Sequence, residues 1–95
     1  MQNERVAVEF FVSASKSSLD CYFTLPLKDG EDWFCVLSIP DLVRSQRFYG
    51  TSHLEAILNT INFVSSFVAS APPLLRQKLS ASETDTLSVR YDYSA

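Results

Sequence analysis

The residue with the clearest capacity for chemistry at neutral pH is His53, the single histidine of the chain. An imidazole titrates near neutral pH and can act as a general acid or base. However, His53 falls in the first turn of a predicted helix, where the positive end of the helix dipole disfavours the imidazolium ion. No serine or cysteine nucleophile lies at a recognisable spacing from it. We therefore expect an exposed first-turn residue and no catalysis; an enzyme or small-ligand site that uses His53 with a nearby carboxylate is the alternative.

Three carboxylates, Asp29, Glu31 and Asp32, surround a predicted turn and raise the question of a cation site. A calcium loop needs ligands at alternating positions over about twelve residues and a closing glutamate, which this cluster does not provide. The chain has only two glycines, Gly30 and Gly50, too few for a glycine-rich phosphate-binding loop. We therefore expect neither a metal nor a cofactor.

The two cysteines, Cys21 and Cys35, lie inside apolar runs and match no zinc or redox spacing. Such cysteines ordinarily serve as small buried hydrophobic side chains. In the hairpin that these runs predict, the two residues stand about four positions apart, roughly 13 Å, which exceeds the ~7 Å limit for a disulfide. The sequence therefore predicts two free thiols.

The composition is that of one ordinary globular domain, residues 1–95, with 46% hydrophobic and 20% charged residues. Eight lysines and arginines against eleven aspartates and glutamates give a net charge of −3. No basic field is then available for a phosphate backbone, so nucleic acid is not an expected partner. No run approaches the about eighteen apolar residues of a membrane helix, and the first residues do not read as a secretion signal. We expect no membrane partner and a cytoplasmic location.

Alternation of apolar and polar residues, the pattern of half-buried strands, recurs in four stretches of the chain. Residues 45–49 can add a short further strand before Gly50. The apolar residues expected on one face of each strand are Val6, Val8, Phe10 and Val12; Cys21, Phe23, Leu25 and Leu27; Trp33, Cys35, Leu37 and Ile39; and Leu87, Val89, Tyr91 and Tyr93.

The second and third of these strands predict a hairpin that closes at residues 29–32. A two-residue turn would mix apolar and polar faces, whereas a three-residue loop sets apolar residues against apolar residues throughout. Pro26 cannot donate to a ladder, so it needs an edge or an unpaired position. The predicted pairs are Leu27 with Trp33, Leu25 with Cys35, Phe23 with Leu37, Cys21 with Ile39, and Lys28 with Asp32.

A capping box, Ser52 and Glu55, predicts where the main helix begins, because the glutamate reaches back to the cap while the serine accepts from the glutamate amide. Pro72 and Pro73 must end this helix near Ala71. The order β-β-β-(β)-α-β is that of an α+β fold, an antiparallel sheet of four or five strands packed on one main helix. The helix stripe expected to face the core consists of Leu54, Ile57, Leu58, Ile61, Val64 and Val68.

Part of the chain resembles a family of short bacterial proteins of unknown function. The shared pattern is a D-W-x-C strand followed by a Y-G-x-[DS]-x-L-x-A-[LI] helix start. Here it corresponds to Asp32, Trp33 and Cys35; Tyr49 and Gly50; and Leu54, Ala56 and Ile57. The resemblance covers about half the chain, implies the same element order and carries no known activity.

The strand-to-helix junction also resembles HicB-type antitoxins. In that family a P-D-L segment precedes a glycine, a helix cap and E-A-L, and the β-β-β-α-β module binds and blocks a small toxin ribonuclease. The spacing here differs by one residue, the glycine after P-D-L-P is missing and no DNA-binding tail follows. The resemblance implies an antitoxin or immunity-type inhibitor as an alternative function. The matching positions are Pro40, Asp41, Leu42, Gly50, Ser52, Glu55, Ala56 and Ile57.

Apolar side chains remain on surfaces that a single helix cannot cover. Phe63 and Phe67 on the back of the helix can be covered by Leu74, Leu75 and Leu79 in a short helical piece over residues 74–80. No further helix or strand remains to cover the apolar side chains on the second face of the sheet. Burial of even about 400 Å² there would favour association by about 10 kcal/mol, before the ~4 to 15 kcal/mol that rigid-body association costs.

We therefore predict a small non-catalytic module that binds protein or associates with itself, as a homodimer or other homo-oligomer, through the open sheet face or an exposed edge. The partner would be a second copy or a small toxin. Two arginines near the fourth strand can bind an acidic partner, although arginines at an edge also prevent aggregation. The predicted interface residues are Phe11, Tyr22, Phe34, Val36, Arg44 and Arg47.

Overall fold

Seven strands and two helices make up the computed structural model, which describes residues 4–94. The predicted α+β class with one main helix is confirmed, as is the additional strand before Gly50, which is longer than expected. In chain order the elements are β1 (Arg5–Val12), β2 (Ser15–Lys16), β3 (Cys21–Thr24), β4 (Leu27–Asp29), β5 (Asp32–Ile39), β6 (Val43–Gly50), α1 (His53–Ser70), α2 (Pro73–Lys78) and β7 (Leu87–Ser94).

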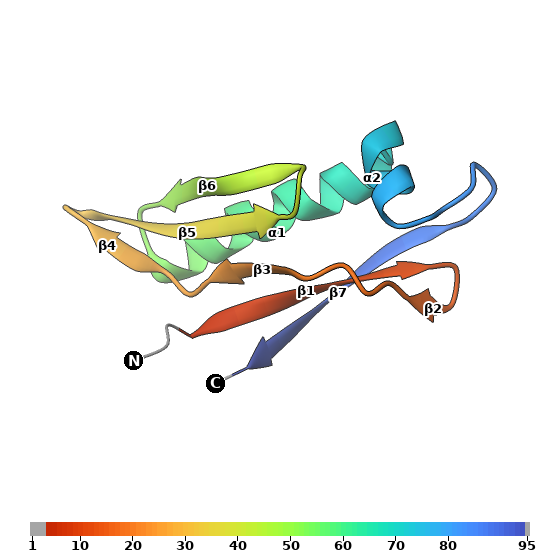
Figure 1. Ribbon diagram of the computed structural model, residues 1–95. Coiled ribbons are helices and arrows are strands. Elements are labelled where there is room, and N and C mark those ends of the chain that lie inside the picture. Colours follow the sequence, from red (N-terminus) through yellow and green to blue (C-terminus); the bar gives the residue numbers. More distant parts are fainter. Residues whose placement is uncertain (1–3, 95) are drawn as a thin grey trace.

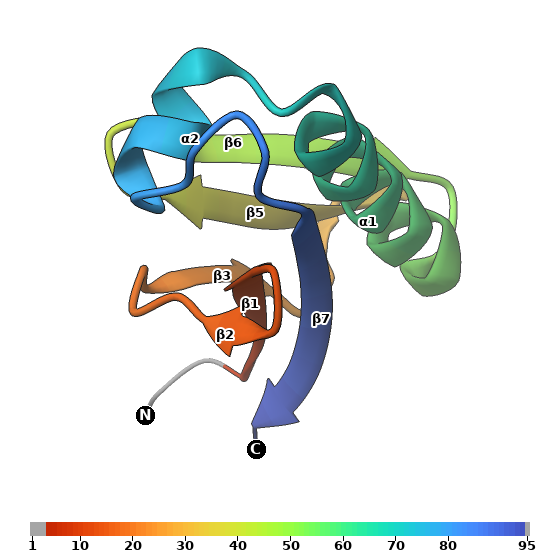
Figure 2. The ribbon, with the colours of Figure 1, turned by 90° about the vertical axis from the view of Figure 1, so that its right-hand side faces the viewer.

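All strands belong to one antiparallel sheet. Strands β3 and β4 follow each other along one edge of β5, while β6 pairs with the other edge. Strand β1 lies between β3 and β7, so the order across the sheet is β6, β5, β3, β1, β7. Both helices lie on the same side of β5 and β6 (Figures 1 and 2). None of the helices in residues 4–94 is long and apolar enough to cross a membrane.

The hydrophobic core lies between α1 and the face of the sheet that carries the predicted apolar residues. Phe10 and Phe23 are fully buried there, and Tyr91 of β7 packs edge-on against Phe23 with 6.1 Å between ring centroids. Both cysteines are buried in this core and are free thiols, as predicted. The other buried hydrophobic residues of the core cluster are Val8, Leu37, Ile39, Val43, Ala56, Val64, Val68, Leu75 and Leu79.

The predicted hairpin register is right at its inner end and wrong at its tip. Phe23 pairs with Leu37 as expected, but Leu27 lies opposite Phe34 on the other face of the sheet, and Lys28 lies opposite Trp33. The strand is interrupted at Leu25 and Pro26. Because Pro26 has no N–H to donate, the ladder shifts by one residue at this break. A two-residue turn then closes the hairpin, with a positive φ of 63° at Gly30 in its first central position.

The main helix begins and ends where the sequence predicts. The Glu55 amide donates to Ser52 Oγ at 3.1 Å, and the Thr51 amide donates to Glu55 Oε1 at 2.9 Å, so the glutamate reaches one residue beyond the cap. At the other end Ala71 adopts a left-handed conformation and its N–H bonds to the carbonyls of Phe67 and Val68. The prolines that follow open the short helix α2.

The buried face of α1 differs from the predicted stripe. The fully covered line is Ala56, Thr60, Val64 and Val68, whereas Leu54 and Leu58 are 63% and 47% exposed. The reason is a close approach of backbones at the start of the helix. A Cβ atom placed on Gly50 would lie 2.4 Å from the Ala56 nitrogen. The helix therefore turns its small residues toward the sheet and leaves the two leucines on its flank.

The back of the helix is covered by more than the predicted leucines. Phe63 stacks on Phe67 and also contacts Phe48 of β6, with ring centroids 5.8 and 4.9 Å apart. Leu75 and Leu79 of the α2 region are buried in the core, as their proposed role requires, but Leu74 is 62% exposed. Strand β6 thus supplies an aromatic cover that the sequence reasoning did not include.

Candidate protein-binding surface

The side of the sheet that faces away from α1 is not covered by any helix or strand in residues 4–94 (Figures 1 and 2). We call this surface the open face. Strand pairing and alternation place on it Arg5, Ala7, Glu9 and Phe11 of β1; Lys16 of β2; Tyr22 and Thr24 of β3; Leu27 of β4; Phe34, Val36 and Ser38 of β5; Arg44, Arg47 and Tyr49 of β6; and Ser88, Arg90 and Asp92 of β7.

All six residues predicted for the interface lie on the open face, but they do not form one tight cluster. Strand pairing sets Arg47 opposite Val36, next to Phe34. At the far end of β1, Phe11 pairs instead with Lys16 and Ser88. The remaining two, Tyr22 and Arg44, line a hollow of about 480 Å³ together with Asp20, Ser38 and Asp41.

The aromatic residues of the open face are less exposed than the sequence predicts. Phe34 is buried, at 8% exposure, and Phe11, Tyr22 and Val36 are half-buried. Three of the four aromatic rings of the open face carry an arginine from a neighbouring position of the sheet. The distances from guanidinium carbon to ring centroid are 4.4 Å for Arg5 over Tyr22, 4.4 Å for Arg47 over Phe34 and 4.9 Å for Arg90 over Phe11. The expected bare apolar patch is therefore replaced by arginine and aromatic pairs.

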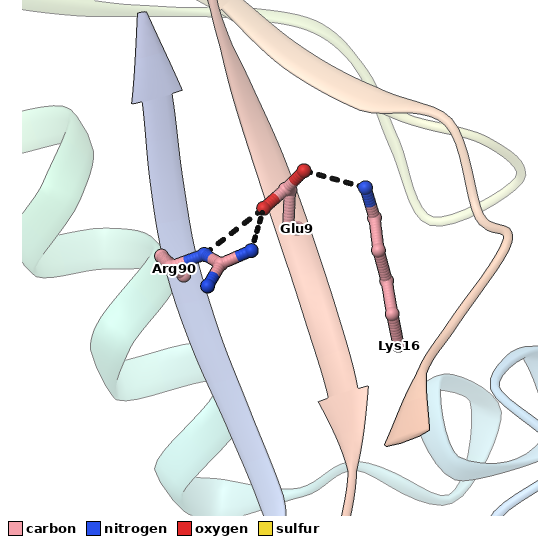
Figure 3. A network of polar contacts seen from close by, with 3 residues as sticks. All are labelled: Glu9, Lys16 and Arg90. Atoms are coloured by element: carbon pink, nitrogen blue, oxygen red, sulfur yellow. Dashed lines mark hydrogen bonds and ion pairs between the residues drawn. The ribbon is translucent and has the colours of Figure 1, made fainter. Parts of the chain in front are cut away.

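At one end of the open face, a carboxylate joins three strands. Glu9 of β1 accepts hydrogen bonds from Lys16 Nζ at 2.5 Å and from Arg90 Nη2 and Nε at 2.9 and 3.1 Å (Figure 3). Its side chain is only 11% exposed. The hydrogen bonds from Lys16 and then from Arg90 lower the pKa of Glu9 below its ordinary value of 4.5. Both cations are thus paired with one carboxylate, so the three charged groups together keep a net charge of +1.

The other cations of the open face have no such partner within residues 4–94. Among the described residues, Arg5, Arg44 and Arg47 form no salt bridge. Arg47 donates to the Tyr49 hydroxyl at 3.4 Å, and that hydroxyl donates to Asp29 Oδ2 at 3.1 Å. The hydrogen bond to Tyr49 is the main cause of a raised pKa of Arg47, so this guanidinium keeps its charge. Three arginines therefore present free hydrogen-bond donors to whatever approaches this face.

The residues considered for catalysis are dispersed. His53 is exposed at the first position of α1, and its ring lies edge-on to Trp33 with centroids 3.7 Å apart. Burial raises the pKa of the Cys21 thiol to about 12 and also raises that of Cys35. Neither thiol is therefore a thiolate nucleophile near neutral pH.

The carboxylates of the β4–β5 turn are exposed. Within residues 4–94 no group of three histidine, cysteine, aspartate or glutamate side chains is arranged to hold a metal ion.

Comparisons of the chain with protein-family models, with curated proteins and with solved structures find no match. The resemblances to the short bacterial family and to HicB-type antitoxins therefore stay predictions.

The open-face residues that were not predicted for the interface include Arg5, Lys16, Tyr49 and Arg90. A signal for Arg90 is present, because it alternates with the apolar residues of the closing strand and so must point away from the core. Its neighbours Glu9 and Phe11 become apparent only once β7 is known to pair with β1. That pairing joins residues 81 positions apart in the chain.

Proposed function

We propose that this chain is a small, non-catalytic module that binds a partner protein through the open face of its sheet. The observation that carries the proposal is the presence, on an uncovered face, of three arginines without a salt-bridge partner among the described residues, two of which lie on aromatic rings. Arginine and aromatic residues are the types that dominate the binding energy of protein interfaces.

The arginines define the chemistry of the partner. A guanidinium held over a ring keeps a fixed orientation and offers paired N–H groups, which match the two oxygens of a carboxylate. The half-buried ring of Tyr22 and the exposed ring of Tyr49 add apolar contact. We infer that the partner surface carries carboxylates next to apolar side chains.

Acidic side chains argue for protein and against nucleic acid as the partner. Glu9 and Asp92 lie on the same face as the arginines, and the chain as a whole carries a net charge of −3. A closely spaced phosphate backbone would meet both carboxylates, whereas a protein surface can place its own charges to avoid them.

Selection of a random twelve-residue peptide library on the immobilised protein tests this proposal. Selected peptides are then titrated against the wild type and two variants by fluorescence anisotropy. Arg47→Ala removes a cation from the open face. Lys28→Ala is the matched control, because Lys28 covers the Trp33 ring at 4.6 Å on the other face of the sheet.

We expect the selected sequences to be rich in aspartate, glutamate and apolar residues, and Arg47→Ala to weaken binding by at least about tenfold while Lys28→Ala leaves it unchanged. Equal binding to both variants would contradict the proposal, as would failure to select any peptide. Tighter binding of a single-stranded oligothymidylate than of any peptide would point to nucleic acid instead.

A further inference from the structure

The outer edge of β7 offers a second interaction surface that does not depend on the open face. Strand β7 pairs with β1 in one continuous register from Leu87 to Ser94. It contains no proline, glycine or bulge, and no element of residues 4–94 pairs with its other edge. A long, regular edge of this kind is a template for a further strand.

The opposite edge of the sheet is protected. Strand β6 has a register shift against β5 between Leu37 and Ile39, and Ser45 has a positive φ of 47°. The Asn59 side chain also donates to the Tyr49 carbonyl at 2.7 Å. Bulges and side chains that bond the edge prevent pairing with another strand. Of the two edges, only β7 is therefore open to strand addition.

The hydrogen-bond pattern identifies which backbone groups of β7 point outward. The Ser13 amide donates to the Thr86 carbonyl at 2.6 Å and continues the ladder between β1 and β7. Hydrogen-bonded pairs alternate with non-bonded pairs in an antiparallel ladder. It follows that the N–H and C=O groups of Ser88, Arg90 and Asp92 face β1.

The groups of the odd-numbered residues, Leu87, Val89, Tyr91 and Tyr93, therefore face outward. The opposite edge of β1 agrees with this assignment, because the Phe10 carbonyl accepts from the Ser17 amide there. Phe10 lies opposite Val89 in the ladder. Because the Phe10 carbonyl points to Ser17 instead, Phe10 and Val89 form no backbone hydrogen bond with each other. The N–H and C=O groups of Val89 therefore point outward, toward the position of a further strand.

Charge selects one register for pairing between two copies of β7. The outward-facing N–H and C=O groups of the two copies must lie opposite each other to form hydrogen bonds. Because these groups belong to the odd-numbered residues, the two-fold axis must pass through a residue, and residues 89, 90, 91 and 92 are the possible positions. An axis at Arg90 sets arginine against arginine, an axis at Asp92 sets aspartate against aspartate, and an axis at Val89 sets Arg90 against the uncharged Ser88. An axis at Tyr91 sets Arg90 of each copy opposite Asp92 of the other, in a non-bonded pair where side chains lie closest. Among the described residues Asp92 has no salt bridge within its own chain.

We propose that a second copy of this chain pairs antiparallel with the outer edge of β7 about a two-fold axis at Tyr91. The pairs of Tyr91 with Tyr91 and of Val89 with Tyr93 then form about six backbone hydrogen bonds. The two sheets become one, and their open faces become continuous.

An uncovered apolar flank beside β7 supports the same arrangement. The Tyr91 hydroxyl bonds the Ile61 carbonyl at 3.3 Å and lies 3.4 Å from Ser65 Oγ, which fixes this flank of α1 against β7. Toward the helix start the flank continues with Leu58 and Leu54. In the same direction β7 runs on to Tyr93 and diverges from the helix (Figure 1).

Leu54, Leu58 and Tyr93 are exposed by 63%, 47% and 54%. In the proposed pair, Val89 of the second copy lies opposite Tyr93, on the side of the sheet that faces α1. The second copy thus places apolar side chains where this chain leaves its own leucines and tyrosine uncovered.

Light scattering on the full chain at about 100 µM tests the pairing. We expect a dimer for the wild type and for Glu83→Arg, a matched charge reversal in the exposed turn before β7. Asp92→Arg sets cations against cations across the axis and is expected to raise the dissociation constant at least about tenfold. A monomeric wild type, or an Asp92→Arg variant that dimerises like Glu83→Arg, would overturn the proposal.

A distance measurement tests the register separately. A nitroxide attached at Ser88→Cys reports the separation of the two labels in the dimer, because both native thiols are buried. An axis at Tyr91 places these positions about six residues apart along the strands, roughly 20 Å, against about 14 Å for an axis at Arg90. Any separation other than about 20 Å would overturn this register. Peptide binding to the open face is measured with the unlabelled wild type, Arg47→Ala and Lys28→Ala, all of which keep β7 unchanged, so the two proposals can fail independently.

Discussion

The two faces of the sheet are built from similar strands but are covered in different ways. On the inner face, Gly50 and Ala56 bring α1 close to the sheet, and fully buried rings such as Phe10 and Phe23 fill the space between them. On the open face, arginines from adjacent strands lie on the rings, and one carboxylate joins three strands. The difference shows that apolar residues on both faces of a strand do not by themselves indicate a missing layer, because long cationic side chains can cover rings while their charges stay in water.

Neighbouring residues of β1 give the sharpest test of this comparison. Phe10 is fully buried in the core, whereas Phe11 is half-buried on the open face under Arg90. Phe10→Ala should lower the free energy of unfolding by about 3 to 5 kcal/mol, because it removes transfer energy and leaves a cavity. Phe11→Ala should lower it by about 1 to 2 kcal/mol, from partial burial and one cation–π contact.

Urea unfolding followed by circular dichroism measures both values under identical conditions. Equal losses for the two variants would show that the open face is as tightly packed as the core, and the contrast between the faces would then be wrong.

The two glycines extend the comparison from side chains to the backbone. Gly50→Ala forces a Cβ into the backbone of α1, so we expect a loss of about 3 kcal/mol. Gly30→Ala meets no atom within 4 Å but keeps a positive φ, so we expect a loss of about 1 kcal/mol from backbone strain alone. Thermal unfolding of both variants measures the difference, and a Gly50→Ala protein as stable as Gly30→Ala would mean that the helix can move away from the sheet without penalty.

Local signals in the sequence predict much of this fold. Alternation, the capping box at Ser52, and the stop at Pro72 depend on residues close together in the chain. The structure confirms the cap, the stop and the alternation, except in the strand that is broken at Pro26. The face of α1 was predicted wrongly for Leu54 and Leu58, because a helical wheel weighs hydrophobicity alone. The presence of Gly50 beneath the helix start makes small residues the better contact, and this depends on the packing of β6 against α1.

The candidate site was only half predictable for a similar reason. Alternation placed Phe11, Tyr22, Phe34 and Val36 on the correct face. The arginines that cover the rings come from strands that pair with them, and Arg90 reaches Phe11 only through the pairing of the first and last strands. Such contacts depend on which strands pair with each other, and the local alternation of residues does not specify this pairing.

The cap of the helix that covers the inner face provides a smaller test. Ser52→Ala removes the hydrogen bond from the Glu55 amide and should lower the free energy of unfolding by about 1 kcal/mol. Ser88→Ala changes an exposed serine of the open face and should alter it by less than about 0.5 kcal/mol. The urea midpoints of the two variants measure this difference. Equal midpoints would mean that the cap does not stabilise α1 in the folded chain.

Low pH should weaken the contacts of the open face more than those of the face toward α1, because the open face contains the paired carboxylate of Glu9. Because the folded-state pKa of Glu9 lies below its ordinary value of 4.5, its ionised form stabilises the fold above about pH 4.5. That stabilisation is lost as the pH falls through the lowered pKa and protonation breaks the contacts with Lys16 and Arg90. The urea midpoint of the wild type should therefore fall between pH 7 and pH 3, and Glu9→Gln should reduce this fall.

Asp41 and Asp85 also have lowered pKa values and keep their contributions in the variant, so part of the acid sensitivity should remain. Glu31→Gln removes a carboxylate that forms no salt bridge among the described residues, and it should leave the pH dependence as in the wild type. If Glu9→Gln and Glu31→Gln gave the same pH dependence, the carboxylate that joins β1, β2 and β7 would contribute nothing specific. The open face would then depend on its arginine and aromatic pairs alone.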